Sequence, residues 1–139
     1  MKLHEFHARS LESTLILADE SVLRIRRLLH DGGQTGIIRQ VTNSLSDGKR
    51  GELQASAEEL RRTFMKFAED FSLKPHPLEL RRVLDAELSS LWVDLQDCRP
   101  DRMKGYGQPF SPEAQKRLEN TIDDLLAQIE AMRMILLED

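Results

Sequence analysis

Residues 11–29 read LESTLILADESVLRIRRLL, and apolar side chains recur in this stretch at alternating intervals of four and three residues. The positions that keep the spacing are Leu11, Leu15, Ala18, Val22, Ile25 and Leu29. An α-helix turns once in about 3.6 residues, so this spacing aligns the apolar side chains along one stripe. It predicts a long amphipathic helix over residues 3–30, which the glycines after Asp31 end.

Three further stretches repeat the pattern and predict three more helices. Residues 51–72 carry Leu53, Ala57, Leu60, Phe64, Phe67 and Phe71. Residues 77–98 carry Leu80, Leu84, Leu88, Leu91, Leu95 and Cys98. Residues 112–139 carry Leu118, Ile122, Leu125, Ile129, Met132 and Leu136. Pro75 and Pro77 separate the second helix from the third, and Ser111 followed by Pro112 is typical of a helix start.

The segment between the first two long helices has a weaker signal. Ile37, Ile38, Val41 and Leu45 have the spacing of a short amphipathic helix over residues 37–45. We therefore predict an all-α chain that forms an antiparallel up-down-up-down four-helix bundle, with a short extra helix between helices 1 and 2. Residues 1–139 are expected to form one domain.

Composition makes several classes of partner less favourable. The chain has 20 Lys and Arg against 24 Asp and Glu, so it has no overall attraction to nucleic acid or to anionic lipid. Apolar runs fall short of the ~18 residues that a membrane span needs. We expect no membrane partner and no nucleic-acid partner. Cys98 is the only cysteine, which suits a reducing compartment, and its place on the third stripe predicts a buried, inert thiol. The expected location is the cytoplasm.

Residue patterns that carry catalysis or hold a cofactor are scarce. Carboxylate-bridged metal sites in helical bundles need Glu-x-x-His pairs, and the sequence has none. His4 and His7 are three residues apart, a spacing that suits a shared metal ion if a third ligand is supplied from elsewhere, but a frayed first turn is the simpler interpretation. We predict no catalytic residue, no metal ligand and no cofactor, and we do not expect an enzyme.

Arginine pairs stand one helical turn from acidic residues. Glu58 precedes Arg62 by four residues, and similar spacings surround the other Arg-Arg pairs. Such pairs stabilise exposed helix surfaces by about 0.2–0.5 kcal/mol each. We interpret them as solvated faces.

The first helix has more apolar surface than one stripe requires. Ile16 and Leu23 project to nearly the opposite side, and a flank between carries Phe6, Leu17 and Leu28. Either residues 37–45 cover this surface or another chain does. We therefore expect a non-catalytic role in protein–protein interaction or self-association, as a homodimer or with another helical protein.

An alternative hypothesis concerns the loop over residues 99–110. It combines the basic residues Arg99, Arg102 and Lys104 with the aromatic residues Tyr106 and Phe110. Cations and rings in one glycine-containing loop suit an anionic small molecule. This alternative predicts a ligand-binding or regulatory domain.

Overall fold

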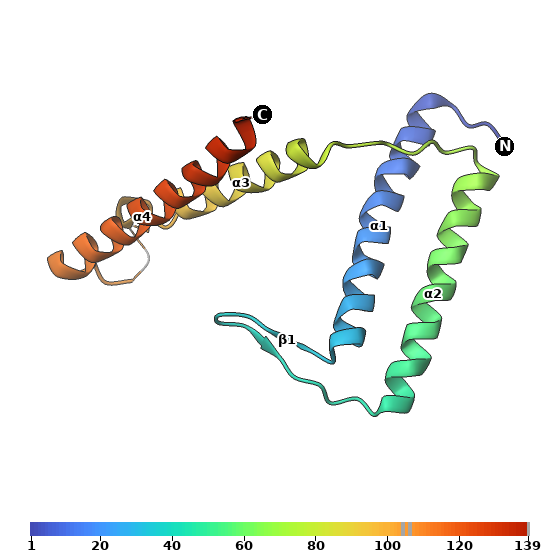
Figure 1. Ribbon diagram of the computed structural model, residues 1–139, viewed down its shortest axis with the longest axis horizontal. Helices are drawn as coiled ribbons and strands as arrows, with labels where there is room; N and C mark the ends of the chain where they lie inside the picture. Colours follow the sequence, from blue (N-terminus) through green and yellow to red (C-terminus); the bar gives the residue numbers. More distant parts are fainter. Residues whose placement is uncertain (104, 106, 139) are drawn as a thin grey trace. The chain divides into compact units, whose positions relative to one another are not determined.

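The computed structural model describes residues 1–103, 105 and 107–138. These residues contain four α-helices: α1 (Glu5–Asp31), α2 (Asp47–Asp70), α3 (Leu80–Gln96) and α4 (Pro112–Leu137) (Figure 1). The prediction of an all-α chain with four long helices is confirmed. No helix within the described part of the chain is long and apolar enough to cross a membrane.

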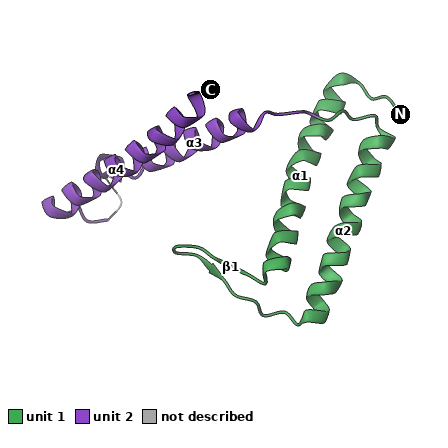
Figure 2. Ribbon diagram, in the orientation of Figure 1, with its two compact units in different colours: residues 1–75 green, residues 76–139 purple. Residues whose placement is uncertain are grey.

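The chain divides into two compact units, residues 1–75 and residues 76–139 (Figure 2). Unit 1 contains α1 and α2, and unit 2 contains α3 and α4. Each unit is an antiparallel helical hairpin, which agrees with the predicted alternation of helix direction. The joining of the two hairpins into one bundle, and the single domain over residues 1–139, stay predictions.

At each end of α1, a group outside the helix binds a backbone group that the helix leaves without a hydrogen-bond partner. His4 precedes the helix, and its Nδ1 accepts a hydrogen bond from the Phe6 backbone N–H at 3.3 Å. Gly32 ends the helix as predicted. It has a left-handed φ of 70° and donates its N–H to the Leu28 carbonyl.

Serine residues begin two of the other helices. The Ser46 hydroxyl accepts a hydrogen bond from the Lys49 backbone N–H at 3.2 Å, so α2 begins before the predicted residue 51. The Ser111 hydroxyl likewise accepts a hydrogen bond from the Ala114 N–H at 3.1 Å, and Pro112 opens α4 as predicted. Both starts follow the preference for a hydroxyl at the N-cap.

Helix α3 is shorter than predicted at both ends. The sequence predicts a helix over residues 77–98, but Glu79 is extended and α3 runs from Leu80 to Gln96. Pro75 and Pro77 bias Lys74 and His76 away from the helical conformation, and residues 77–79 stay outside the helix as well. After α3, the short 3-10 helix η1 (Pro100–Met103) occupies part of the predicted loop.

The prediction of a short helix over residues 37–45 is wrong, because this region contains a β-hairpin. Strand β1 (Gln34–Thr35) pairs antiparallel with β2 (Gln40–Val41). Gly33 has a φ of 137°, and a Cβ there would lie 2.4 Å from the Val41 carbonyl oxygen. Only glycine fits this position. The β-branched residues in the segment favour extended backbone over helix.

The hairpin tip is fully open to solvent. The Gly36 N–H donates to the Arg39 carbonyl at 2.9 Å, which leaves Ile37 and Ile38 between them. These two isoleucines are 103% and 94% exposed. They contribute nothing to the core.

Each unit has a small core between its two helices. The buried apolar residues are Val22 and Ala57 in unit 1 and Leu88, Ile122, Leu126 and Ile129 in unit 2. All except Leu126 belong to the predicted stripes, and Leu125, which the sequence favours instead, is 37% exposed. A helix with one neighbour covers only part of its apolar stripe, so many other stripe positions remain partly exposed.

Candidate interaction surface

Ion pairs between α1 and α2 mark one face of unit 1. The Arg61 guanidinium donates from Nε and Nη2 to the two Asp19 carboxylate oxygens at 2.7 and 3.3 Å. Arg26 lies 2.6 Å from Glu58. The sequence predicts that Glu58 pairs with Arg62 along α2. That prediction is wrong, because the Glu58 carboxylate meets Arg26 across the hairpin.

The paired carboxylate shifts the ionisation of Arg61. The hydrogen bond with Asp19, followed by the charge of that carboxylate, raises the pKa of Arg61 above its ordinary value. A raised pKa means that the fold favours the protonated guanidinium. Its contribution to stability is therefore complete below the ordinary pKa and is lost only as the pH rises through the raised value. This face keeps the Arg61 charge throughout the physiological range.

The opposite face of unit 1 is apolar. Leu17 lies two residues before Asp19, and Leu60 lies two residues after Glu58. Two residues turn a helix through about 200°, so both leucines point away from the ion pairs. Because the ion pairs join α1 and α2 along one face, the two leucines share the other face.

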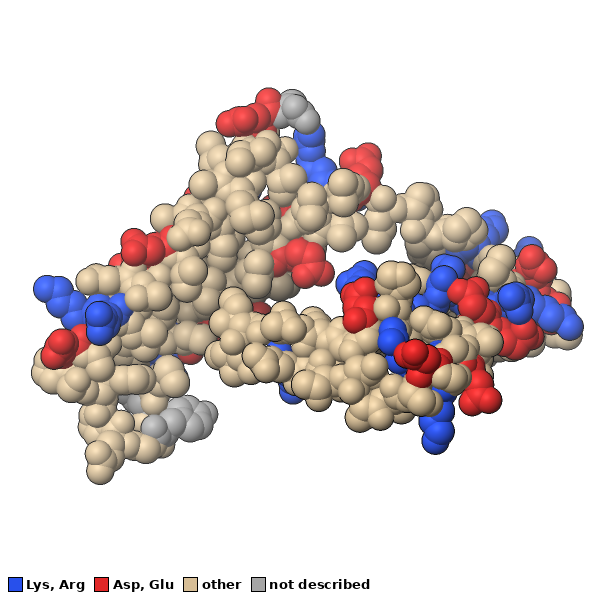
Figure 3. Space-filling model, turned by 60° about the horizontal axis from the view of Figure 1, so that its bottom comes forward, with Lys and Arg blue, Asp and Glu red and all other residues tan. Residues whose placement is uncertain are grey.

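We call this surface the apolar face. Its large side chains are 36% to 71% exposed and comprise Phe6, Leu17, Ile25, Leu28, Leu53 and Leu60. Hydroxyl side chains occupy neighbouring positions on the same two helix surfaces: Thr14, Ser21, Ser56 and Thr63. Figure 3 shows one view of the surface, in which charged side chains are crowded over one part and sparse over another. A group of large exposed apolar side chains such as the apolar face is typical of a binding surface.

The predicted interface residues do not lie together. Three of them belong to the apolar face: Phe6, Leu17 and Leu28. Ile16 and Leu23 lie instead beside the ion pairs, because Ile16 is three residues from Asp19 and Leu23 is three residues from Arg26. Their exposures are 43% and 37%, so the segment over residues 37–45 does not bury them.

The α2 part of the apolar face escaped the sequence prediction. Leu53 and Leu60 keep the four-three spacing and were therefore expected in the core, but they are 46% and 45% exposed. Only Ala57, on the same stripe, is buried against α1. One feature of the sequence could have predicted this exposure: the apolar stripe of α2 is wider than the surface that one neighbouring helix covers.

Unit 2 has a less continuous apolar surface. Asp85 of α3 lies 3.3 Å from Arg133 of α4, and Arg99, which follows the end of α3, lies 2.8 Å from Asp123 of α4. Three exposed apolar residues each lie two positions from one of these charged residues: Val83 from Asp85, Leu125 from Asp123 and Ile135 from Arg133. Glu87 also stands two residues from Asp85 and interrupts this surface with a charge.

The 99–110 loop borders a pocket of about 410 Å³. Its described lining includes Asp101, Met103, Pro109 and Phe110. Of the predicted ligand residues, only Phe110 belongs to this described lining. Lys104 and Tyr106 lie outside the described residues. Anionic-ligand binding stays a prediction.

The two described arginines of the loop already have partners. Arg99 donates to the Gln96 side-chain oxygen at 2.7 Å and to Asp123 at 2.8 Å. Arg102 lies 3.5 Å from Asp97. Neither arginine belongs to the described lining of the pocket.

The remaining candidate residues have structural contacts. Cys98 is exposed, so the prediction of a buried thiol is wrong; α3 ends before it, and its Sγ donates to the Asp94 carbonyl at 3.4 Å. The rings of His4 and His7 meet edge to face at 6.1 Å between centroids. No group of three or more His, Cys, Asp or Glu side chains within the described ranges is placed to hold a metal ion.

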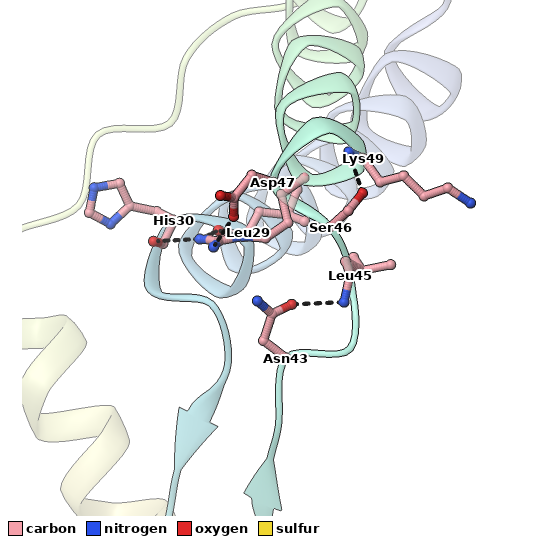
Figure 4. A network of polar contacts seen from close by, with 8 residues as sticks. Leu29, His30, Asn43, Leu45, Ser46, Asp47 and Lys49 are labelled. Atoms are coloured by element: carbon pink, nitrogen blue, oxygen red, sulfur yellow. Dashed lines mark hydrogen bonds and ion pairs between the residues drawn. The ribbon is translucent and has the colours of Figure 1, made fainter.

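A polar network closes the β-hairpin end of unit 1 (Figure 4). Arg50 Nε donates to the Leu29 carbonyl at 3.0 Å, and Arg50 Nη2 donates to the His30 carbonyl at 3.1 Å. The Asn43 side-chain oxygen accepts a hydrogen bond from the Leu45 N–H at 2.9 Å. The first turn of α2 thus holds the last turn of α1, which fixes the pairing of the two helices.

No protein-family model, no curated protein and no solved structure matches the chain.

Proposed function

We propose that the chain is a non-catalytic helical protein that self-associates, and that the apolar face of unit 1 is the contact surface. The observation that carries this proposal is the separation of charge within unit 1. Two ion pairs lie on one face, beside the exposed Ile16 and Leu23, and a larger group of exposed apolar side chains with hydroxyl neighbours lies on the other. Burial of apolar side chains in a second copy removes them from water, which favours association by about 25 cal/mol per Å².

The amount of exposed surface supports a stable contact. The surface of the chain measures 11690 Å². Two separate compact units of this size would together expose about 9,000 Å². A stable protein–protein interface buries about 1,200–2,000 Å² in total, of which each partner supplies half. The difference between these areas belongs to the whole chain, and the apolar face would need to supply about 600–1,000 Å² of it per copy.

We propose a second copy as the occupant, in place of the predicted joining of unit 1 to unit 2 of the same chain, because Glu87 interrupts the apolar surface of unit 2 and α1 and α2 resemble half of a four-helix bundle. Two hairpins that meet through their apolar faces would complete the second layer of such a bundle. Closed two-fold dimers are also the commonest homo-oligomers. The single cysteine suits a reducing compartment, and we propose a cytoplasmic location on this ground.

The test compares two double variants that carry equal added charge. Leu17→Glu with Leu60→Glu places carboxylates in the apolar face, and Ile16→Glu with Leu23→Glu places them beside the ion pairs. Sedimentation velocity over a range of concentrations measures association, and circular dichroism confirms that the helices persist. We expect the first variant to be monomeric and the second to associate like the unmodified chain.

Two other results would change the conclusion. Dissociation by the Ile16 and Leu23 changes alone would move the contact to the ion-pair face. Equal association of both variants and the unmodified chain would remove the apolar face as the contact surface.

A further inference from the structure

We propose that the two copies stack with α1 of each chain over α2 of the other, and that Arg24 of one copy pairs with Glu52 of its partner across the rim of the contact. This inference rests on the proposed self-association and specifies its geometry. It begins with charged residues that border the apolar face.

Arg24 and Glu52 lie on opposite rims of the apolar face. Val22 faces α2, and Arg24 follows it by two residues, about 200° around α1. Ala57 faces α1, and Glu52 precedes it by five residues, about 140° around α2. Arg24 also stands four residues before Leu28, so it borders the same helix surface as that leucine.

Neither residue has an ion-pair partner among the described residues. Arg24 Nη2 donates to the Ser21 hydroxyl at 3.1 Å, which leaves its charge uncompensated. Two other pairs of charges in unit 1 join the helices: Arg61 with Asp19 and Arg26 with Glu58. One unpaired cation and one unpaired anion therefore border the same exposed apolar surface.

The two charges also lie within about two helical turns of each other along the hairpin. Asp19 lies opposite Arg61, and α1 and α2 run in opposite directions. Counted from the Asp19–Arg61 pair, Arg24 is at the level of Ser56, and counted from the Arg26–Glu58 pair it is at the level of Leu60. Glu52 therefore lies about one to two helical turns away, an offset that the long Arg24 side chain and the Glu52 side chain span together only when both lean along the helices.

Two-fold symmetry allows two ways of stacking the apolar faces. If the axis runs along the helices, α1 of one copy lies over α2 of the other at the same level. If the axis runs across the helices, α1 lies over α1 and α2 over α2. Only the first stacking brings each Arg24 to a Glu52, and it does so twice, because a two-fold contact repeats every pair. Opposite charges at a rim favour the stacking that pairs them.

The experiment reverses each charge and then mixes the variants. In Arg24→Glu, both rim contacts become Glu against Glu, and in Glu52→Arg both become Arg against Arg. We expect each single variant to associate about ten-fold more weakly than the unmodified chain at low salt. The difference should shrink as salt is added. Arg27→Glu makes the same charge change beside Leu23, away from the apolar face, and should leave association unchanged.

A mixture of the two single variants provides the decisive measurement. In a mixed dimer both rim contacts again join opposite charges, so the mixed species should predominate over either homodimer in native mass spectrometry. The double variant Arg24→Glu with Glu52→Arg should also regain association. Unweakened association of both single variants, with no preference for the mixed dimer, would overturn the stacking.

Failure of this dimer geometry can be distinguished from failure of the proposed self-association. If the Leu17 and Leu60 changes dissociate the chain while the charge changes do not, self-association stands and this geometry fails. If the unmodified chain is monomeric at every concentration, both proposals fail.

Discussion

At the C-terminal end of α1, the Arg50 guanidinium of α2 binds carbonyl groups that the helix leaves unpaired. It donates to the carbonyls of Leu29 and His30, and its side chain is 22% exposed. Hydrogen bonds from a charged donor contribute about 1.5–3 kcal/mol when the site is partly shielded from water. Arg50 therefore stabilises both the end of α1 and its pairing with α2.

Replacement of Arg50 by methionine should lower the stability of unit 1 by about 1–3 kcal/mol, because carbonyl groups lose their charged donor. Thermal unfolding followed by circular dichroism measures this effect. Arg27→Met removes an arginine for which no ion pair is found in the described ranges, and it should leave the midpoint nearly unchanged. Equal midpoints for the two variants would show that the Arg50 contacts contribute nothing to stability.

Among the elements, the β-hairpin is where the local sequence signals conflict. Ile37, Ile38 and Val41 have a spacing that fits a helix, but Gly33 and Gly36, which precede them, impose a different backbone. The Gly33 amide donates to the Leu28 carbonyl, and its φ of 137° directs the chain into β1. The element is therefore determined by backbone conformation at one glycine, which apolar spacing does not report.

Gly33→Ala should disrupt the hairpin while α1 and α2 remain helical. The added Cβ would lie 2.4 Å from the Val41 carbonyl oxygen, and the conformation is strained for any residue with a side chain. Loss of the cross-strand nuclear Overhauser contacts between Gln34 and Val41, with helical circular dichroism retained, is the expected result.

A matched glycine change provides the control. Gly48→Ala lies within α2, where a Cβ meets no heavy atom within 4 Å, and should stabilise the helix by about 0.5–1 kcal/mol. Cross-strand contacts that persist in Gly33→Ala would contradict the role assigned to Gly33.

The long helices were predictable because their signals are local. Ser111 with Pro112 and the glycines after Asp31 act within a few residues, and the structure places helix boundaries at both. Ser46 carries the same kind of signal, but the predicted helix starts at residue 51, after Gly48. Boundaries near prolines were less predictable, because Pro77 is compatible with a helix start and with an extended segment.

At the scale of the whole molecule, each unit contains a helical hairpin that covers its apolar stripes only in part. Leu53 and Leu60 illustrate why sequence alone could not specify the candidate surface. Their spacing predicts an apolar side of a helix, but a stripe does not indicate whether a helix of the same chain or of another chain covers it. In the structure, the ion pairs Asp19–Arg61 and Arg26–Glu58 mark one face of the hairpin, and Leu53 and Leu60 lie on the opposite face.

The central claim is that a second copy covers the apolar face of unit 1. Sedimentation equilibrium of the unmodified chain, from low micromolar to submillimolar concentration, tests it most directly. We predict a mass that rises with concentration to twice the 16.0 kDa of the single chain. A mass that stays at 16.0 kDa over the whole range would contradict the claim.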